Sequence, residues 1–295
     1  MSLVLFDVSN FIFRAYYSTP KDMVNDKNEP TNAIFGVANM MLDIIGKFSK
    51  SREMIFPVCC FDGKSSRKSR TDVDKTYKQN RQSVDDNLKV QFSGVKELIE
   101  RMGIHMIEID YKEADDVIAS IVTQQQENFE EIIICSPDKD FCQLILKDHI
   151  KMYEPKKQII INKTEFEEKY KIPMRLFTQY QALIGDQADN VKGVKGIGPK
   201  YAVEVINECD GNIYDYIKKQ AKRSKLIESE IKNYELSLKM VTLEKDLNVD
   251  MNFEQFFHDS VKDNKLLKEY FYMQNFNKLL NKYYNVKKLK FIDED

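Results

Sequence analysis

One short segment, Glu130–Asp140, constrains the fold of this chain more than any other. It contains an unbroken apolar run, Ile132–Cys135, of the kind that forms a strand buried on both faces of a parallel sheet. The run stops before a proline, and two aspartates, Asp138 and Asp140, follow it. Open α/β sheets bind ligands beside the carboxyl ends of their strands. Taken alone, the segment fits an acidic ligand-binding edge and an ordinary surface loop equally well.

Other strand-like runs in the chain also end in an acid. Leu3–Phe6 is followed by Asp7, and Met54–Phe61 is followed by Asp62. Between them, residues 31–47 place apolar side chains at helical spacing, which predicts an amphipathic helix lying on the sheet. The recurrence of strand, helix and strand favours an α/β fold with acids at one edge.

Three more acids follow a third expected strand, His105–Ile109. Glu113, Asp115 and Asp116 lie at the start of a segment with helical spacing. Acids in the first turn of a helix are ordinarily explained by the helix dipole. Because three of them stand beside a strand end, we interpret them as part of the same acidic edge.

A basic segment, residues 64–81, follows the second expected strand. Its cations outnumber its acids by five, so the net charge of −2 hides a separation of charge along the chain. Tyr77 lies within it. Cations interleaved with an aromatic ring suit a nucleic-acid strand, the cations for phosphates and the ring for a base. A solvated helix face is the ordinary alternative.

A glycine-rich segment follows the next pair of acids. Asp186 and Asp189 precede the turn Gly193–Gly198, and Pro199 stands where a helix is expected to begin. Backbone amides in such a turn can approach a phosphate closely, since glycine has no side chain in the way. The spacing is neither that of a dinucleotide-binding loop nor that of a P-loop.

The acids together suggest a chemistry. They are Asp7, Asp62, Glu113, Asp115, Asp116, Asp138, Asp140, Asp186 and Asp189. If the strands are parallel and adjacent, the first seven converge, and like charges so close require compensation. Oxygen ligands favour Mg²⁺ or Mn²⁺ over zinc. Two such ions about 4 Å apart form a device for phosphodiester cleavage, and the basic segment supplies the attraction for a polyanion that the acids lack.

The composition argues against other classes of site. The chain has only three, widely separated histidines and five cysteines without a CxxC pair, which disfavours a zinc site, a disulfide framework and a Ser-His triad. Its apolar runs are shorter than the roughly 18 residues of a membrane span, and its start has no basic leader. We therefore expect a cytoplasmic protein with no membrane partner.

The ordered motifs resemble the 5′-nuclease family, which includes flap endonucleases, phage 5′-exonucleases and the 5′-nuclease domain of bacterial DNA polymerase I. The matching segments are, in chain order, LVLFDVSNFIFRAYY, FDG, YKQNR, GI…EADDVIA, SPDKDFCQL and GDQADNVKGVKGIGPKYA. The resemblance implies an α/β fold with a mostly parallel, PIN-like central sheet flanked by helices. It also implies a helical arch near residues 64–92.

The resemblance places all nine acids at two Mg²⁺ ions, for which Mn²⁺ would substitute. The first ion would be served mainly by Asp7, Asp62, Glu113, Asp115, Asp116 and Asp138. The second would be served mainly by Asp140, Asp186 and Asp189. Lys78 and Arg81 would contact the scissile phosphate, and Tyr77 would stack on an unpaired terminal base.

The remaining DNA contacts are expected from the arch and the glycine turn. The residues implied are Arg67, Arg70, Lys192, Gly193, Lys195, Gly196, Gly198 and Lys200. The turn would belong to a helix–three-turn–helix module near residues 175–208 that grips duplex DNA, with a K⁺ ion at the carbonyls of residues 193–198. We expect a nuclease core over residues 1–172 and a helical region over residues 173–295.

The implied activity is structure-specific 5′ nuclease action on DNA flaps and RNA primers in replication and repair. Branched or nicked duplex DNA with a 5′ single strand and RNA–DNA primer junctions are the expected substrates, and single-stranded-DNA-binding or clamp proteins the candidate partners. Since the sequence ends at Asp295 without a polymerase domain, we expect a free-standing, monomeric, phage-type enzyme in the host cytoplasm. A non-catalytic junction-binding protein of the same fold and a PIN-type ribonuclease are the alternatives.

Overall fold

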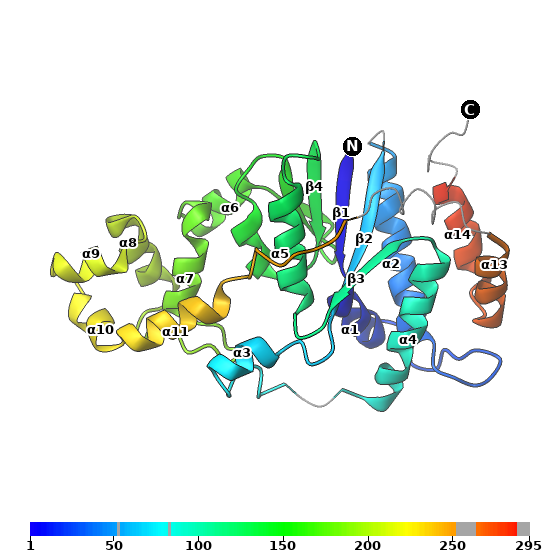
Figure 1. Ribbon diagram of the computed structural model, residues 1–295, viewed down its shortest axis with the longest axis horizontal. Helices are drawn as coiled ribbons and strands as arrows, with labels where there is room; N and C mark the ends of the chain where they lie inside the picture. The colour runs from blue at the N-terminus through cyan, green and yellow to red at the C-terminus, as the bar shows by residue number, and fades with distance from the viewer. Residues whose placement is uncertain (52–53, 82–83, 252–263, 288–295) are drawn as a thin grey trace.

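A computed structural model describes residues 1–51, 54–81, 84–251 and 264–287 (Figure 1). A six-stranded sheet with the order β3-β2-β1-β4-β5-β6 forms its centre. The strands are β1 (Ser2–Asp7), β2 (Ile55–Asp62), β3 (His105–Ile109), β4 (Glu131–Cys135), β5 (Ile150–Glu154) and β6 (Ile159–Ile161). All neighbours are parallel except β5 and β6, which pair antiparallel. The mostly parallel sheet expected from the apolar runs is therefore confirmed.

The register of the strands brings their carboxyl ends to one edge. Asp7 is opposite Cys60 of β2, one strand away, and Phe6 is opposite Cys135 of β4. Every residue of β1 is buried, as expected for a strand covered on both faces. The acids that follow these strands consequently start from neighbouring positions.

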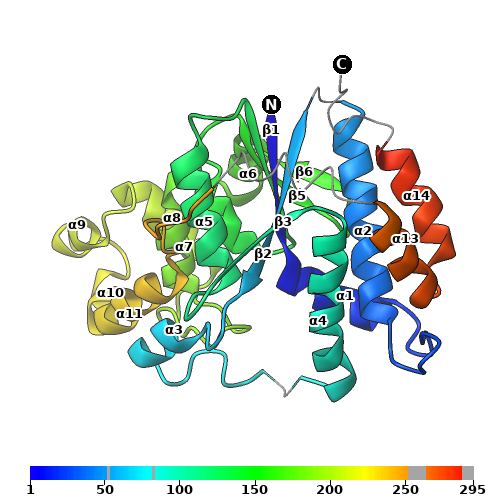
Figure 2. The ribbon, with the colours of Figure 1, turned by 45° about the vertical axis from the view of Figure 1, so that its right-hand side comes forward.

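Alternate residues of β1 point into two separate apolar cores. Leu3 and Leu5 pack with α5 (Ala114–Gln125), whereas Val4 and Phe6 face the opposite side. That side is covered by α1 (Val8–Ser18), α2 (Asn32–Ser49) and α4 (Asp86–Arg101) (Figure 2). Because successive side chains of a strand point to opposite faces, alternate residues of β1 pack against different helices.

The region after the sheet divides into two groups of helices on opposite sides of the molecule (Figure 1). One group contains α6 (Lys163–Tyr170), η2 (Met174–Leu176), α7 (Phe177–Ile184), α8 (Pro199–Cys209), α9 (Ile213–Lys218), α10 (Ser224–Ser229) and α11 (Ile231–Val241). The other contains α13 (Asn264–Met273) and α14 (Asn277–Lys287), which pack against α4 and α2 of the sheet layer. None of the helices in the described ranges is long and apolar enough to cross a bilayer.

The helical region expected over residues 173–295 is interrupted at residues 242–251, which we call the crossover segment. After α11 this segment runs without regular structure across α5 (Figure 1). Its apolar residues Leu247, Val249 and Met251 are buried at every second position, a period that a helix cannot use on one face. Residues 252–263 and 288–295 lie outside the described residues.

Candidate active site

Asp7 is the buried acid at the centre of the carboxyl edge. It stands at the N-cap of α1 and accepts a hydrogen bond from the backbone N–H of Asn10 at 3.3 Å. The Asn10 side chain and the Ser136 hydroxyl, at 2.8 Å, donate to the other carboxylate oxygen. The side chain is therefore held in one orientation by groups from α1 and from the residue that follows β4.

Asp62 joins the end of β2 to the start of α5. Its carboxylate accepts the backbone N–H of Ala114 at 2.9 Å. The next residue, Gly63, lies so close to β3 that an added Cβ would stand 1.8 Å from the Ile109 carbonyl oxygen. Only glycine fits at this position while Asp62 lies beside α5, which explains on steric grounds why glycine follows the acid in the FDG motif.

Four further acids come from the loops after β4 and α7. Asp138 caps the 3₁₀ helix η1 (Lys139–Leu144) by accepting the Asp140 N–H at 3.0 Å. Asp140 accepts a hydrogen bond from Gln181 of α7 at 2.5 Å. Asp186 pairs with Lys139 at 2.8 Å, and Asp189 follows in the same turn. Contacts with α7 therefore bring the second group of acids to the sheet edge.

The pKa values of the acids show that they repel one another. Burial raises the pKa of Asp7 to about 6, and the neighbouring Asp62 and Asp138 raise it further, against hydrogen bonds that lower it. Burial and then Asp138 raise the pKa of Asp140 to about 7. The pKa of Asp115 is well above its usual range because of burial and then Asp7 and Asp138. These carboxylates consequently form one electrostatic cluster.

The raised pKa values predict how the stability of the metal-free protein changes with pH. Asp7 and Asp140 bind protons more tightly in the folded than in the unfolded state, so folding loses stability as the pH rises from about 4 to about 7. In EDTA, the free energy of unfolding of the wild type should fall over this range. Asp7→Asn should show a smaller fall and should be at least as stable as the wild type at pH 7, which denaturant titration at pH 5 and pH 7 will measure. An equal pH dependence in both proteins would contradict the repulsion.

Cations from the arch segment lie directly on the acids. The Lys78 ammonium is 2.6 Å from Glu113 and 3.5 Å from Asp189, and Arg81 is 2.6 Å from Asp189. Lys78 and Arg70 hold the pKa of Glu113 below its usual value, although burial alone would raise it. The predicted basic pair is thus brought to the predicted acids and forms ion pairs with two of them, Glu113 and Asp189.

The donor set fits a hard divalent cation in its chemistry. Within the part of the chain that the structure describes, no three acidic, histidine or cysteine side chains meet as a ready-made group of metal ligands. Mutual repulsion of the carboxylates and their ion pairs with Lys78, Arg81 and Lys139 account for this spacing. Carboxylate oxygens whose pKa values are raised by one another are nevertheless the groups that Mg²⁺ or Mn²⁺ would compensate.

Tyr77, expected to stack on a base, is directed into the protein. Its side chain is buried, and its hydroxyl lies 3.1 Å from Glu113. Lys78 lies 4.8 Å from the ring centroid and Arg70 lies 5.9 Å from it. In this arrangement the ring packs between protein cations, and stacking on DNA would require it to turn outward. Arg67, by contrast, is exposed just before α3 (Lys68–Val73).

The glycine turn between α7 and α8 separates packing positions from surface positions. Gly193 is buried, its N–H donates to Ser237 at 3.0 Å, and an added Cβ would lie 2.4 Å from the Gly185 nitrogen. Its amide therefore serves packing, which differs from the expected phosphate contact. Gly196, at a φ of 86°, is exposed at the tip. Gly198 is half-buried, and Lys192, Lys195 and Lys200 are exposed around the turn.

Sequence reasoning missed two residues, one beside the acids and one at the glycine turn. Lys139 lies between the two acids of the SPDKD motif and pairs with Asp186. Its position between carboxylates was a usable signal. Arg223 lies over the Tyr201 ring, 3.2 Å from its centroid, and donates to the Gly196 carbonyl at 3.4 Å. Nothing in the spacing of the sequence connects Arg223 to the glycine turn.

Two profiles of known families match the chain. The N-terminal resolvase-like domain of 5′-3′ exonucleases matches residues 2–171, and the C-terminal SAM fold of 5′-3′ exonucleases matches residues 172–265. The chain belongs to the 5′-3′ exonuclease family. The resemblance read from the sequence motifs is thereby confirmed.

Individual members of the 5′-3′ exonuclease family agree with this assignment. A 5′-3′ exonuclease of Aquifex aeolicus is 31% identical over 254 residues, which cover 86% of this chain and 85% of the relative. The flap endonuclease Xni of Shewanella denitrificans is 29% identical over 258 residues, which cover 86% and 98%. The expected enzyme class, a nuclease of the 5′-3′ exonuclease and flap endonuclease type, is confirmed by these relatives.

The fold also matches that of a solved family member. The T5 D15 protein co-crystallised with metal ions superposes with a TM-score of 0.65 at 17% identity, covering 97% of this chain and 100% of that protein. The T5 D15 flap endonuclease has also been solved with DNA and metal ions, with a TM-score of 0.64 at 18% identity, covering 95% and 100%. The expected PIN-like nuclease architecture is thus confirmed.

Proposed function

We propose that this chain is a structure-specific 5′ nuclease that hydrolyses phosphodiesters of DNA flaps and RNA primers with two divalent ions. The observation that carries the proposal is the direct contact between Lys78 and Arg81 and the cluster of carboxylates. A site that holds both acids and cations can bind metal ions and attract the phosphate they act on. Neither set alone would do both.

Eight acids are proposed to hold Mg²⁺, for which Mn²⁺ would substitute. Asp7, Asp62, Glu113, Asp115 and Asp138 would serve the first ion, and Asp140, Asp186 and Asp189 the second. Bound ions would lower the pKa of a water and compensate the charge that develops on the phosphate. Asp116 is left out of this set because its oxygens are engaged by Arg70 and by the backbone of Glu244.

The arch cations are proposed to act on the substrate. Lys78 pairs with Glu113 and Arg81 pairs with Asp189, two acids that would hold metal ions. When free of these partners, both cations would contact the scissile phosphate, where a positive group stabilises developing negative charge. Tyr77, released from the Glu113 carboxylate, is proposed to stack on the unpaired terminal base. Arg67 is proposed to contact the 5′ strand, and Arg70 would reach that strand only by leaving Asp116 and Glu113, against which its guanidinium is buried.

Duplex DNA is proposed to bind at the glycine turn. The contacting residues would be Lys192, Lys195, Gly196, Gly198 and Lys200, with Gly193 supporting the turn. A K⁺ ion at carbonyls of residues 193–198 belongs to the same proposal, and the carbonyl of Gly196 already faces the Arg223 cation. We propose that the enzyme acts as a monomer in the cytoplasm, alongside clamp or single-stranded-DNA-binding proteins.

Product mapping on one flap substrate tests the proposal. A duplex with a 5′ single-stranded flap, labelled at either end in separate reactions, should be cut near the junction in Mg²⁺ and left intact in EDTA. The products should carry a 5′-phosphate and a 3′-hydroxyl. Uncut substrate that is nevertheless bound would favour a junction-binding protein. Faster cleavage of free single-stranded RNA would favour a PIN-type ribonuclease.

A further inference from the structure

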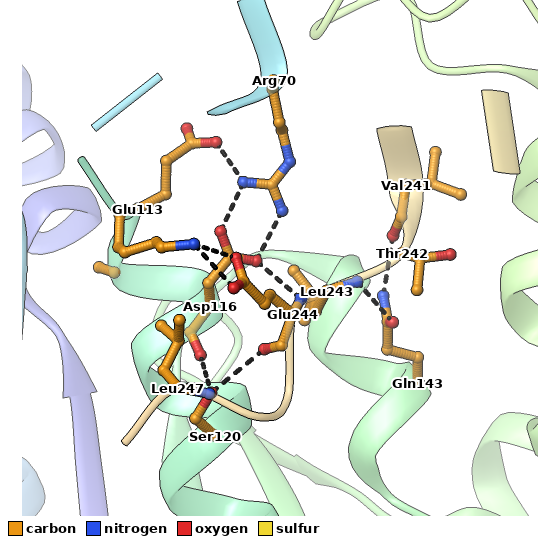
Figure 3. Close-up of polar contacts among 12 residues, drawn as sticks. Arg70, Glu113, Asp116, Ser120, Gln143, Val241, Thr242, Leu243, Glu244 and Leu247 are labelled. Carbon is orange, nitrogen blue, oxygen red and sulfur yellow. Dashed lines mark hydrogen bonds and ion pairs between the residues drawn. The ribbon is translucent and has the colours of Figure 1, made fainter. Parts of the chain in front are cut away.

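Asp116 makes contacts unlike those of the acids around it. Its carboxylate takes a two-pronged ion pair from Arg70 of the arch, with the two guanidinium nitrogens 2.8 and 2.7 Å from its two oxygens (Figure 3). It also accepts the backbone N–H of Glu244 at 2.9 Å. A carboxylate has about four acceptor positions, and three of them are occupied here. One of the partners is a backbone amide, which cannot swing away as a lysine side chain can.

Asp116 is buried among groups different from those around the residue before it. Asp115 lies near Asp7 and Asp138, whose charges help to raise its pKa after burial, the largest cause. Its side chain is 2% exposed and is directed toward Arg70 and the crossover segment. Asp115 and Asp116, although adjacent on α5, therefore face different parts of the molecule: Asp115 faces the other acids, and Asp116 faces Arg70 and the crossover segment.

The crossover segment is held by further side chains next to Asp116. Ser120, one turn along α5, accepts the Leu247 N–H at 3.2 Å and donates to the Asp116 carbonyl at 2.9 Å (Figure 3). Gln143 binds both the Val241 carbonyl and the Leu243 N–H at 3.1 Å. Asp116 is thus the point where the arch and the chain leaving α11 are fixed to α5.

We infer that Asp116 is a positioning residue that ties the arch, through Arg70, to the crossover segment, and that it binds no metal ion. The arch and the helices of the glycine turn are thereby linked through one buried carboxylate. When DNA is bound at the glycine turn, this linkage would keep the arch in position over the acids. The inference concerning catalysis rests on the proposed nuclease function, whereas the linkage itself is a property of the fold.

Counting bound Mn²⁺ separates a positioning residue from a metal ligand. Asp116→Asn keeps the shape of the side chain and removes its charge. By titration followed with electron paramagnetic resonance, this variant should bind as many Mn²⁺ ions as the wild type, whereas Asp115→Asn should bind fewer or bind them at least tenfold more weakly. Loss of one ion in Asp116→Asn would overturn the inference. Absence of binding by the wild type would instead count against the proposed function.

Hydrogen exchange tests the linkage without metal or activity. In EDTA, peptides that cover residues 242–249 should exchange roughly tenfold faster in Asp116→Asn than in the wild type, the scale of replacing a charged hydrogen-bond acceptor by a neutral one. Peptides that cover residues 193–198 should be unchanged. Arg70→Gln is the second variant, and it should loosen the arch peptide to the same extent as Asp116→Asn. Unchanged exchange over residues 242–249 and over the arch would overturn the linkage.

A double-mutant cycle tests the effect on catalysis. Asp116→Asn should lower the single-turnover rate by about tenfold, and Arg70→Gln by at least as much, since Arg70 also pairs with Glu113. The double variant should be no slower than Arg70→Gln, because that variant has already lost the pair with Asp116. Additive losses would show that the two residues act independently. Thermal unfolding of each variant verifies that the fold is retained.

Discussion

Asp138→Asn should abolish cleavage of a 5′-flap substrate while flap binding persists. A metal ion contributes several kcal/mol of charge stabilisation to phosphoryl transfer, and a loss of about 4 kcal/mol is about 10³-fold in rate. The Asn oxygen can still accept the Asp140 N–H that caps η1, so the local fold is retained. Removal of a negative charge does not weaken the attraction for DNA. Single-turnover cleavage in Mg²⁺ and a separate binding assay in Ca²⁺ measure the two effects.

Asp110→Asn provides the matched control for this variant. Asp110 also follows a parallel strand, β3, but is exposed and makes no ion pair within the described residues. The same chemical change there should leave the cleavage rate within about twofold of the wild type, as for most surface substitutions. Near-normal turnover by Asp138→Asn would show that this carboxylate holds no essential ion. An equal loss in both variants would point to a general effect of charge at this edge.

The strands and the acids were predictable because both are encoded locally. An apolar run such as Ile132–Cys135 needs burial on all sides, which a strand at the centre of a covered sheet provides. Once the strands are parallel, the acid after each of them must reach the same edge, and Asp7, Asp62 and Asp138 do so. The convergence of acids from distant segments is therefore a consequence of topology, and topology was indicated by the order of strands and helices.

The directions of individual side chains were less predictable because they depend on long-range partners. Asp115 and Asp116 are adjacent in sequence, yet Asp116 faces Arg70 and the Glu244 amide, which belong to segments far away in the chain. Tyr77 is an aromatic residue among cations, as expected of a residue that stacks on a base, but its side chain is buried against Glu113. Without a known position for the arch, spacing alone cannot tell a surface aromatic from one that packs inward.

The crossover segment shows a related limit of sequence reasoning. It contains one lysine and three acids, a charged composition like that of the helices before it, so nothing in its composition separated it from the expected helical region. Its conformation is instead fixed by side chains of α5 and η1 that satisfy its backbone groups, such as Gln143 on Leu243 and Ser120 on Leu247. Buried backbone groups need partners, and here the partners come from elements more than 90 residues away in the chain.

Lys78→Ala should lower the single-turnover rate of flap cleavage by about 10²-fold or more, the scale of losing one oriented group that stabilises developing charge. The backbone of residue 78 is held by the Asp189 carbonyl at 3.0 Å, so the arch should keep its path without the side chain. Affinity for the flap substrate should change little, because other cations of the arch and of the glycine turn are also proposed to contact the phosphates. Rates at saturating enzyme in Mg²⁺ separate the chemical step from binding.

Lys75→Ala is the matched control, since Lys75 is an exposed cation three residues earlier in the same turn. This substitution should lower the single-turnover rate by less than about twofold. Lys78→Arg should recover part of the rate, because a guanidinium restores the charge but not its position. A normal rate for Lys78→Ala would remove this residue from the active site. Equal losses for Lys75→Ala and Lys78→Ala would mean that the arch acts through its total charge, which would contradict the specific contact between Lys78 and the acids.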